Sequence, residues 1–175
     1  MKKFVALLLA VLMVASLCAC GQKDTGSDLQ TVTKGKLTMS TNAQFPPYES
    51  VADDGKGYEG TGFEGIDIEI AYALAQKLGL ELVVDDMDFD SALSAVQTGK
   101  SDIVAAGVTV TPERQNTMSF TDSYANGVQV VIVKEGSDIK SIDDLEGKKI
   151  GTQRGTTGFI YCSDDYGDDN VIGFD

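Results

Sequence analysis

Residues 65–84, GIDIEIAYALAQKLGLELVV, contain the pattern that decides the fold. Apolar side chains between Ile66 and Leu78 recur at the spacing of one helical face, and Gly79 follows where helices commonly end. The residues on that face are Ile66, Ile70, Ala73, Leu74 and Leu78. The aliphatic run Leu80–Val84 predicts a strand directly after the helix.

The alternation of strands and helices extends to both sides of this stretch. Upstream, Lys36–Ser40 alternates in polarity and predicts a strand. Downstream, the expected elements are a helix over 90–98, a strand over 102–106, a brief helix with Thr111 as N-cap and Pro112 at its first position, a strand over 128–133, a short helix over 141–146 and a strand over 149–152. Strands separated by helices predict an α/β fold with a parallel sheet.

The first nineteen residues predict a secretory signal peptide. A basic start at Met1-Lys2-Lys3 precedes a 14-residue apolar run, Phe4–Leu17, shorter than the roughly 20 residues of a spanning helix. The run ends in Leu17-Cys18-Ala19-Cys20, which resembles a bacterial lipoprotein signal with Cys20 as the lipidated first residue; an ordinary signal peptide beside an incidental cysteine is the alternative. We expect residues 20–35 to be a polar, lipidated tether on the outer side of a membrane.

The composition excludes several functions. The chain has 27 acidic and 14 basic side chains, a net charge of -13, which disfavours binding to nucleic acid. It contains no histidine, so it cannot build an imidazole base, a histidine-ligated metal site or the usual catalytic triad. Once the signal peptide with Cys18 is removed and Cys20 is acylated, Cys162 has no disulfide partner in this sequence. We expect no metal and no cofactor.

Two local motifs suggest other ligands. Residues 60–65 satisfy G-x-G-x-x-G, and Asp85 follows twenty residues later, as in dinucleotide-binding folds. That site requires a strand running directly into the glycines, whereas a polar turn, residues 52–57, precedes them. Asp86, Asp88 and Asp90 are spaced like the start of a calcium loop, but the sixth and twelfth positions hold Ser91 and Gln97 instead of glycine and glutamate.

A wider resemblance covers most of the chain from Lys36 onward. The segment Gly65–Leu78 resembles the signature of the extracellular solute-binding proteins of polar amino-acid ABC importers, known as family 3. Further blocks similar to that family follow in the family's order: Lys36–Asn42, Phe45–Glu49, Met87–Phe89, Ala106–Arg114, Ser119–Tyr124, Asp143–Gly151 and Gly155–Gly158. The resemblance implies the type II periplasmic-binding-protein fold, with two α/β lobes that close over an amino acid.

The resemblance also implies the binding residues. Arg114 would hold the ligand's carboxylate in a bidentate contact, supported by Gly107 and Thr109. Phe45 and Phe89 would enclose the ligand, its ammonium against their rings. The remaining expected contacts are Asn42, Gln153, Thr156 and Thr157. Asn42 stands where some relatives carry an acidic residue, which favours a ligand that is not purely cationic.

The family pattern further implies the layout of the chain. Lobe 1 would span residues 36–125, the hinge crossing 126–134 and the start of lobe 2 residues 135–175. The sequence stops at Asp175 where relatives continue, so lobe 2 would be incomplete, and we expect weak or no amino-acid binding. The expected partners are an amino acid, an importer permease and, through the lipid anchor, the membrane; we expect a monomer. The alternatives are an enzyme on this fold, such as a cyclohexadienyl dehydratase, and the sensing domain of a receptor.

Overall fold

The structure is a computed structural model that describes residues 29–175, of which Thr31–Asp175 form one compact unit. The predicted signal peptide and Cys20 lie outside the described residues. Within the described part of the chain, no helix combines the length and the apolar character needed to cross a membrane.

A three-stranded parallel sheet forms the centre of the first part of this unit. Its strands are β1 (Lys36–Thr41), β5 (Glu81–Asp86) and β6 (Ile103–Val104), in the order β5-β1-β6. Lys36 of β1 pairs with Glu81 of β5, and Met39 of β1 pairs with Ile103 of β6. The parallel α/β arrangement predicted from the sequence is therefore confirmed.

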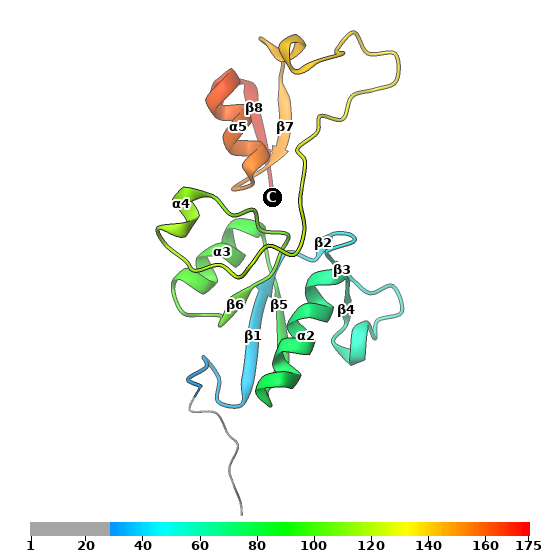
Figure 1. The fold of residues 1–175 in the computed structure, drawn as a ribbon. Helices are drawn as coiled ribbons and strands as arrows, with labels where there is room; N and C mark the ends of the chain where they lie inside the picture. The colour runs from blue at the N-terminus through cyan, green and yellow to red at the C-terminus, as the bar shows by residue number, and fades with distance from the viewer. Residues whose placement is uncertain (1–28) are drawn as a thin grey trace, which may run out of the picture. The chain divides into compact units, whose positions relative to one another are not determined.

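Two helices cover opposite faces of this sheet (Figure 1). Met39 of β1 is fully buried against Ile68 and Ala71 of α2 (Ile66–Leu78). The next residue, Ser40, points to the other face, because side chains alternate along a strand. There its hydroxyl donates to the carbonyl oxygen of Ala92, 2.9 Å away, on α3 (Phe89–Gln97). Both helices have the type and the approximate bounds predicted from the sequence.

The buried face of α2 differs from the predicted one. The side chains that the structure buries are Asp67, Ile68, Ala71 and Ala75. Ile66, Ile70 and Leu74, the larger members of the predicted face, are exposed. The helix is therefore rotated so that small residues and one carboxylate face inward, where they allow a close approach to the sheet. Gly79 ends the helix in the left-handed conformation, as predicted.

A second, antiparallel sheet precedes α2 and was absent from the sequence prediction. It consists of β2 (Gln44–Phe45), β3 (Glu49–Val51) and β4 (Phe63–Glu64), with the 3-10 helix η1 (Tyr58–Gly60) between β3 and β4. Gly65 links this sheet to α2 at a φ of 125°, and a Cβ there would lie 2.3 Å from the Tyr48 carbonyl oxygen. This close approach accounts for the last glycine of the G-x-G-x-x-G pattern without a nucleotide.

The segment after β6 contains one short helix and then a long extended stretch. Thr111 caps α4 (Pro112–Gln115) by accepting a hydrogen bond from the Arg114 amide at 3.3 Å, as predicted. The predicted strand over 128–133 is wrong for this structure, since the segment pairs with no other strand among the described residues. Val128 and Ile132 are 84% and 93% exposed. A β-prone sequence without a ladder partner stays an extended chain.

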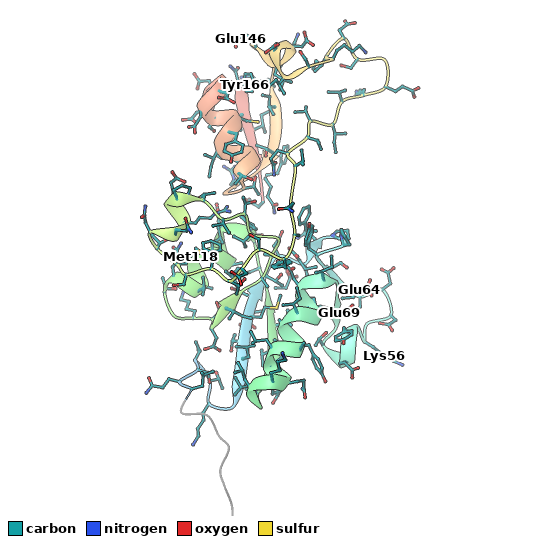
Figure 2. The ribbon with its side chains drawn as sticks, in the orientation of Figure 1. Lys56, Glu64, Glu69, Met118, Glu146 and Tyr166 are labelled. Carbon is teal, nitrogen blue, oxygen red and sulfur yellow. The ribbon has the colours of Figure 1, made fainter. Side chains whose placement is uncertain are left out.

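The C-terminal part of the unit is a smaller α/β arrangement. It comprises η2 (Ile142–Leu145), β7 (Ile150–Gln153), α5 (Thr157–Tyr166), η3 (Asp168–Asn170) and β8 (Val171–Phe174). β7 and β8 pair in parallel, and α5 packs against both strands. The hydroxyl of Tyr166, labelled in Figure 2, donates to the Ile142 carbonyl oxygen at 2.9 Å and so ties α5 to η2.

Candidate functional site

Arg114 on α4 is the buried basic residue of the described chain, because it is only 9% exposed; the other buried charged residues, Glu49 and Asp67, are acidic. Its guanidinium donates through Nη1 to the Thr109 carbonyl oxygen at 2.7 Å and through Nη2 to the Gly155 carbonyl oxygen at 2.9 Å. Burial lowers the pKa of Arg114, and the negative charge of Asp90 opposes that shift. The group remains a cation, and the two oxygens to which it donates are neutral.

Phe89 forms the apolar wall beside this cation. It is the first residue of α3, and its ring centroid lies 5.6 Å from the guanidinium carbon of Arg114. The ring is also buried in a cluster with Leu93 and Ala106, against which Met118, labelled in Figure 2, packs. Phe89, which is 8% exposed, therefore belongs to the core as well as to the candidate site.

Gly107, Phe45 and Tyr48 form the second wall. Phe45 and Tyr48 stack with ring centroids 5.3 Å apart and planes 15° from parallel. A Cβ at Gly107 would lie 3.0 Å from Cε1 of Phe45, and its φ of 54° also favours glycine. The Phe45 side chain is 52% exposed, so the ring presents a free face next to the backbone of Gly107.

Asn42 and Gln153 connect the two parts of the unit. Gln153 Nε2 donates to Asn42 Oδ1 at 3.0 Å, and Asn42 Nδ2 donates to the Met87 carbonyl oxygen at 3.0 Å. Asn42 lies at the end of β1 and Gln153 at the end of β7, so both side chains emerge from carboxyl ends of parallel strands, where α/β proteins place ligands.

Three of the predicted contacts come from threonines in different settings. Thr109 is exposed, with its carbonyl oxygen bound to Arg114. Thr156 caps α5: its hydroxyl accepts from the Phe159 amide at 3.2 Å and donates to the Gln153 carbonyl oxygen at 2.8 Å. Thr157 is buried. The hydroxyl of Thr156 is thus committed to the helix start, which leaves the backbone of this turn as the part available to a ligand.

Four residues around the site were not predicted from the sequence. Asp90 lies in the first turn of α3, and a Cβ at Gly155 would come within 1.5 Å of its carboxylate. Asp67, Glu49 and Tyr124 form a polar cluster behind Gly107. Each belongs to a block that carries the resemblance or adjoins one, but their contacts depend on tertiary packing, which no spacing rule reveals.

The described residues offer no metal centre, since residues 29–175 contain no cluster of three His, Cys, Asp or Glu side chains with suitable geometry. Cys162 is partly buried and free, and burial raises the pKa of its thiol. The chemistry that remains is that of a buried guanidinium, aromatic walls, amides and backbone groups. Such a set can bind and orient a small zwitterion.

The fold and these groups are those of an α/β protein with a candidate site for a small polar ligand. Comparison with known sequences gives the class a name: the family of bacterial extracellular solute-binding proteins, family 3, matches residues 37–169. The chain belongs to this family, whose members bind solutes outside the cytoplasm. The resemblance proposed from the sequence blocks, and the periplasmic-binding-protein fold that it implied, are confirmed.

Individual relatives support the assignment. The arginine-binding extracellular protein ArtP of Bacillus subtilis is 39% identical over 89% of this chain and 57% of its own. The structure of holo ArgBP from T. maritima is 37% identical with a TM-score of 0.72, over 81% of this chain and 60% of its own. AncCDT-1, an ancestral amino acid-binding protein and precursor of cyclohexadienyl dehydratase, is 32% identical with a TM-score of 0.68, over 80% and 61%. The chain thus spans about three fifths of the length of the relatives it matches.

Proposed function

We propose that this chain binds an amino acid outside the cytoplasm and presents it to an ABC importer. The observation that carries the proposal is the buried guanidinium of Arg114, which lies between the Phe89 ring and two backbone carbonyls. Relatives named for arginine binding and for amino-acid binding have the same fold over most of the chain.

The physical argument concerns the partners of Arg114. Its hydrogen bonds to Thr109 and Gly155 go to neutral oxygens, and a ligand carboxylate offers charge-assisted, bidentate bonds that are about twice as strong. The planar fork of arginine matches the two oxygens of a carboxylate. Exchange of the Gly155 carbonyl for a carboxylate is therefore favourable, and the walls formed by Phe45 and Phe89 would hold the ligand's ammonium.

The side chain of the ligand would meet amides. Asn42 and Gln153 already hydrogen-bond to each other, and both are neutral. We infer that the ligand is a polar amino acid whose side chain can replace or extend this amide pair, with Thr157 and the backbone of Thr156 on the same side. Arginine is included in the test because of the relatives' names, although a neutral pair gives a cation no charged partner.

Lipid anchoring is part of the same proposal. The signal at residues 1–19 and the lipidated Cys20 would keep the protein on the outer side of the membrane, with residues 20–35 as the tether. Two or more acyl chains anchor a protein stably.

We propose closure of two lobes over the ligand as the mechanism of delivery. Lobe 1 would span residues 36–125, the crossing 126–134, and lobe 2 would begin at residue 135. A permease would bind the closed form.

We propose binding rather than catalysis for this site. The carboxylate nearest to Arg114 is that of Asp90, which is exposed, and histidine is absent from the sequence. AncCDT-1, although a precursor of an enzyme, is itself described as an amino acid-binding protein. Incubation with prephenate or arogenate tests this point, since turnover of either would contradict it.

Amide NMR of residues 21–175 tests the proposed site. Arginine, glutamine and histidine are each titrated to ~10 mM, above the ~1 mM dissociation constant that corresponds to about -4 kcal/mol. We expect one of them to shift the amides of Gly107 and Thr109, and Arg114→Lys to reduce that affinity by roughly tenfold or more because the fork is lost. Arg154→Lys is the matched control, because Arg154 pairs with Asp175 at 3.1 Å on the surface. Shifts that persist unchanged in Arg114→Lys, or no shift with any of the three, would contradict the proposal.

A further inference from the structure

Asp67 lies behind the candidate site and is completely buried. It is the second residue of α2, and its two carboxylate oxygens have different partners. Oδ2 accepts from the backbone amide of Gly107 at 2.7 Å, and Oδ1 accepts from the hydroxyl of Tyr124 at 2.7 Å. One carboxylate therefore joins two segments that are 40 and 57 residues away from it in the sequence.

The environment makes this carboxylate dependent on hydrogen bonds. Among residues 29–175, no lysine or arginine comes within salt-bridge distance of Asp67. Its acidic neighbour is Glu49, which is 1% exposed on β3. A buried charge without a cation must be stabilised by hydrogen bonds, and each bond to a charged group contributes more than one between neutral groups.

The two donors occupy positions that matter for binding. Gly107 packs under the ring of Phe45, so its amide fixes the backbone against the aromatic wall of the site. Tyr124 ends the block that precedes the expected crossing at 126–134, so its hydroxyl fixes the point where the chain leaves the first part of the unit. The start of α2 is itself held by the turn that carries Phe45, since the Asp67 amide donates to the Tyr48 carbonyl oxygen at 2.9 Å.

We propose that Asp67 is a positioning residue that couples the binding backbone at Gly107 to the chain exit at Tyr124. Loss of the Tyr124 hydroxyl would remove the donor to Oδ1 of this buried carboxylate. The carboxylate would then turn toward another donor, and this change weakens its bond to the Gly107 amide. The role of this coupling in ligand binding rests on the proposed amino-acid function. The coupling between Gly107 and Tyr124 does not depend on that function.

Tyr124→Phe is the variant that tests the coupling, because it removes one hydroxyl from a half-exposed side chain and leaves the ring in place. Tyr72→Phe is the matched control: the Tyr72 ring packs edge-on against Tyr58, with centroids 5.4 Å apart, and its hydroxyl has no hydrogen bond within the described residues. The measurements are the chemical shift and the hydrogen-exchange rate of the Gly107 amide in residues 21–175, first without any amino acid. A short hydrogen bond to a carboxylate shifts the signal of an amide proton downfield. General destabilisation of the fold would affect many amides and would not change this one signal by itself.

We expect Tyr124→Phe to shift the Gly107 proton upfield and to speed its exchange by roughly tenfold, equivalent to about 1.4 kcal/mol, while Tyr72→Phe changes neither. An unchanged Gly107 amide in Tyr124→Phe would overturn the coupling, whichever ligand the chain binds. The affinity for the amino acid found above is then compared between the two variants. If exchange of the Gly107 amide becomes faster in Tyr124→Phe while the affinity stays constant, the role in binding is overturned. If the chain binds no amino acid, only the proposed function is contradicted, and the exchange rates still decide whether the coupling exists.

Discussion

Glu49 gives the structure a pH dependence that a single substitution can isolate. Its side chain is almost completely buried on β3, and its Oε2 has no hydrogen-bond partner within the described residues. Burial, and to a smaller extent the charge of Asp67 and a hydrogen bond with it, raise the pKa of Glu49 from 4.5 to about 9. Tyr124 also belongs to this cluster, and burial raises its pKa, so its hydroxyl stays neutral across the range.

The sign of the effect follows from proton counting. Between pH 4.5 and 9 the folded chain holds a proton on Glu49 that the unfolded chain has lost. The stability due to this group is therefore complete below pH 4.5 and declines by about 1.4 kcal/mol per pH unit as the pH rises toward 9. Glu49→Gln keeps the shape of the protonated side chain and cannot ionise. We expect the variant to gain about 3 kcal/mol relative to the parent chain between pH 6 and pH 8.

Urea unfolding followed by circular dichroism and tyrosine fluorescence measures this difference at pH 5, 6, 7 and 8. Glu64→Gln is the matched control, because Glu64 is exposed on β4 and pairs with Ser50 in the same small sheet (Figure 2). Its difference from the parent chain should not grow with pH. A constant difference for Glu49→Gln, or one that turns against the variant as the pH rises, would refute the buried protonated carboxyl.

Three further predictions follow from single positions. Gly107→Ala adds a Cβ 3.0 Å from the Phe45 ring at a φ of 54°, so we expect a loss of about 1–3 kcal/mol in unfolding free energy, measured by urea denaturation; an unchanged midpoint would contradict the packing. Ser40→Ala removes a fully buried hydroxyl that donates to Ala92, so thermal unfolding should show a loss of about 1–3 kcal/mol, and a neutral result would mean that the carbonyl finds another donor. Cys20→Ser in the full-length chain should abolish incorporation of a labelled fatty acid into the protein in bacterial cells, whereas unchanged labelling would show that Cys20 is not the lipidated residue.

Local signals in the sequence were sufficient for the central sheet and its helices. Gly79 ends α2 and Thr111 caps α4 as expected, because caps depend on the backbone of a few adjacent residues. The small sheet β2-β3-β4 was not predicted, since two- and three-residue strands carry too little periodicity. The strand expected over 128–133 failed for the opposite reason: its composition is strongly β-prone, but a strand also requires a partner.

The site could be predicted in part for a similar reason. Arg114, Phe89 and Gly107 were predicted because motif and chemistry agreed on them; the structure places Arg114 over Phe89 at 5.6 Å, and their role in binding stays a prediction. What the sequence could not show is how each group is held. The Thr156 hydroxyl is committed to capping α5, which a list of polar residues cannot reveal.

The rotation of α2 and the role of Asp67 have a common cause. A helix with Ile66, Ile70 and Leu74 on one side would be expected to bury them, yet all three are exposed. Successive residues differ by about 100° around a helix axis, so burying Asp67 and Ile68 turns that aliphatic stripe away from the sheet. The inward face has Ala71 and Ala75, which let the helix approach Met39 closely and bring the Asp67 carboxylate within 2.7 Å of the Gly107 amide. If hydrophobic burial alone set the orientation, the carboxylate would point to solvent and the Gly107 amide would lose this acceptor. The polar contacts of Asp67 are therefore part of what orients the helix, and the failed prediction of its buried face leads to the residue that we propose positions Gly107.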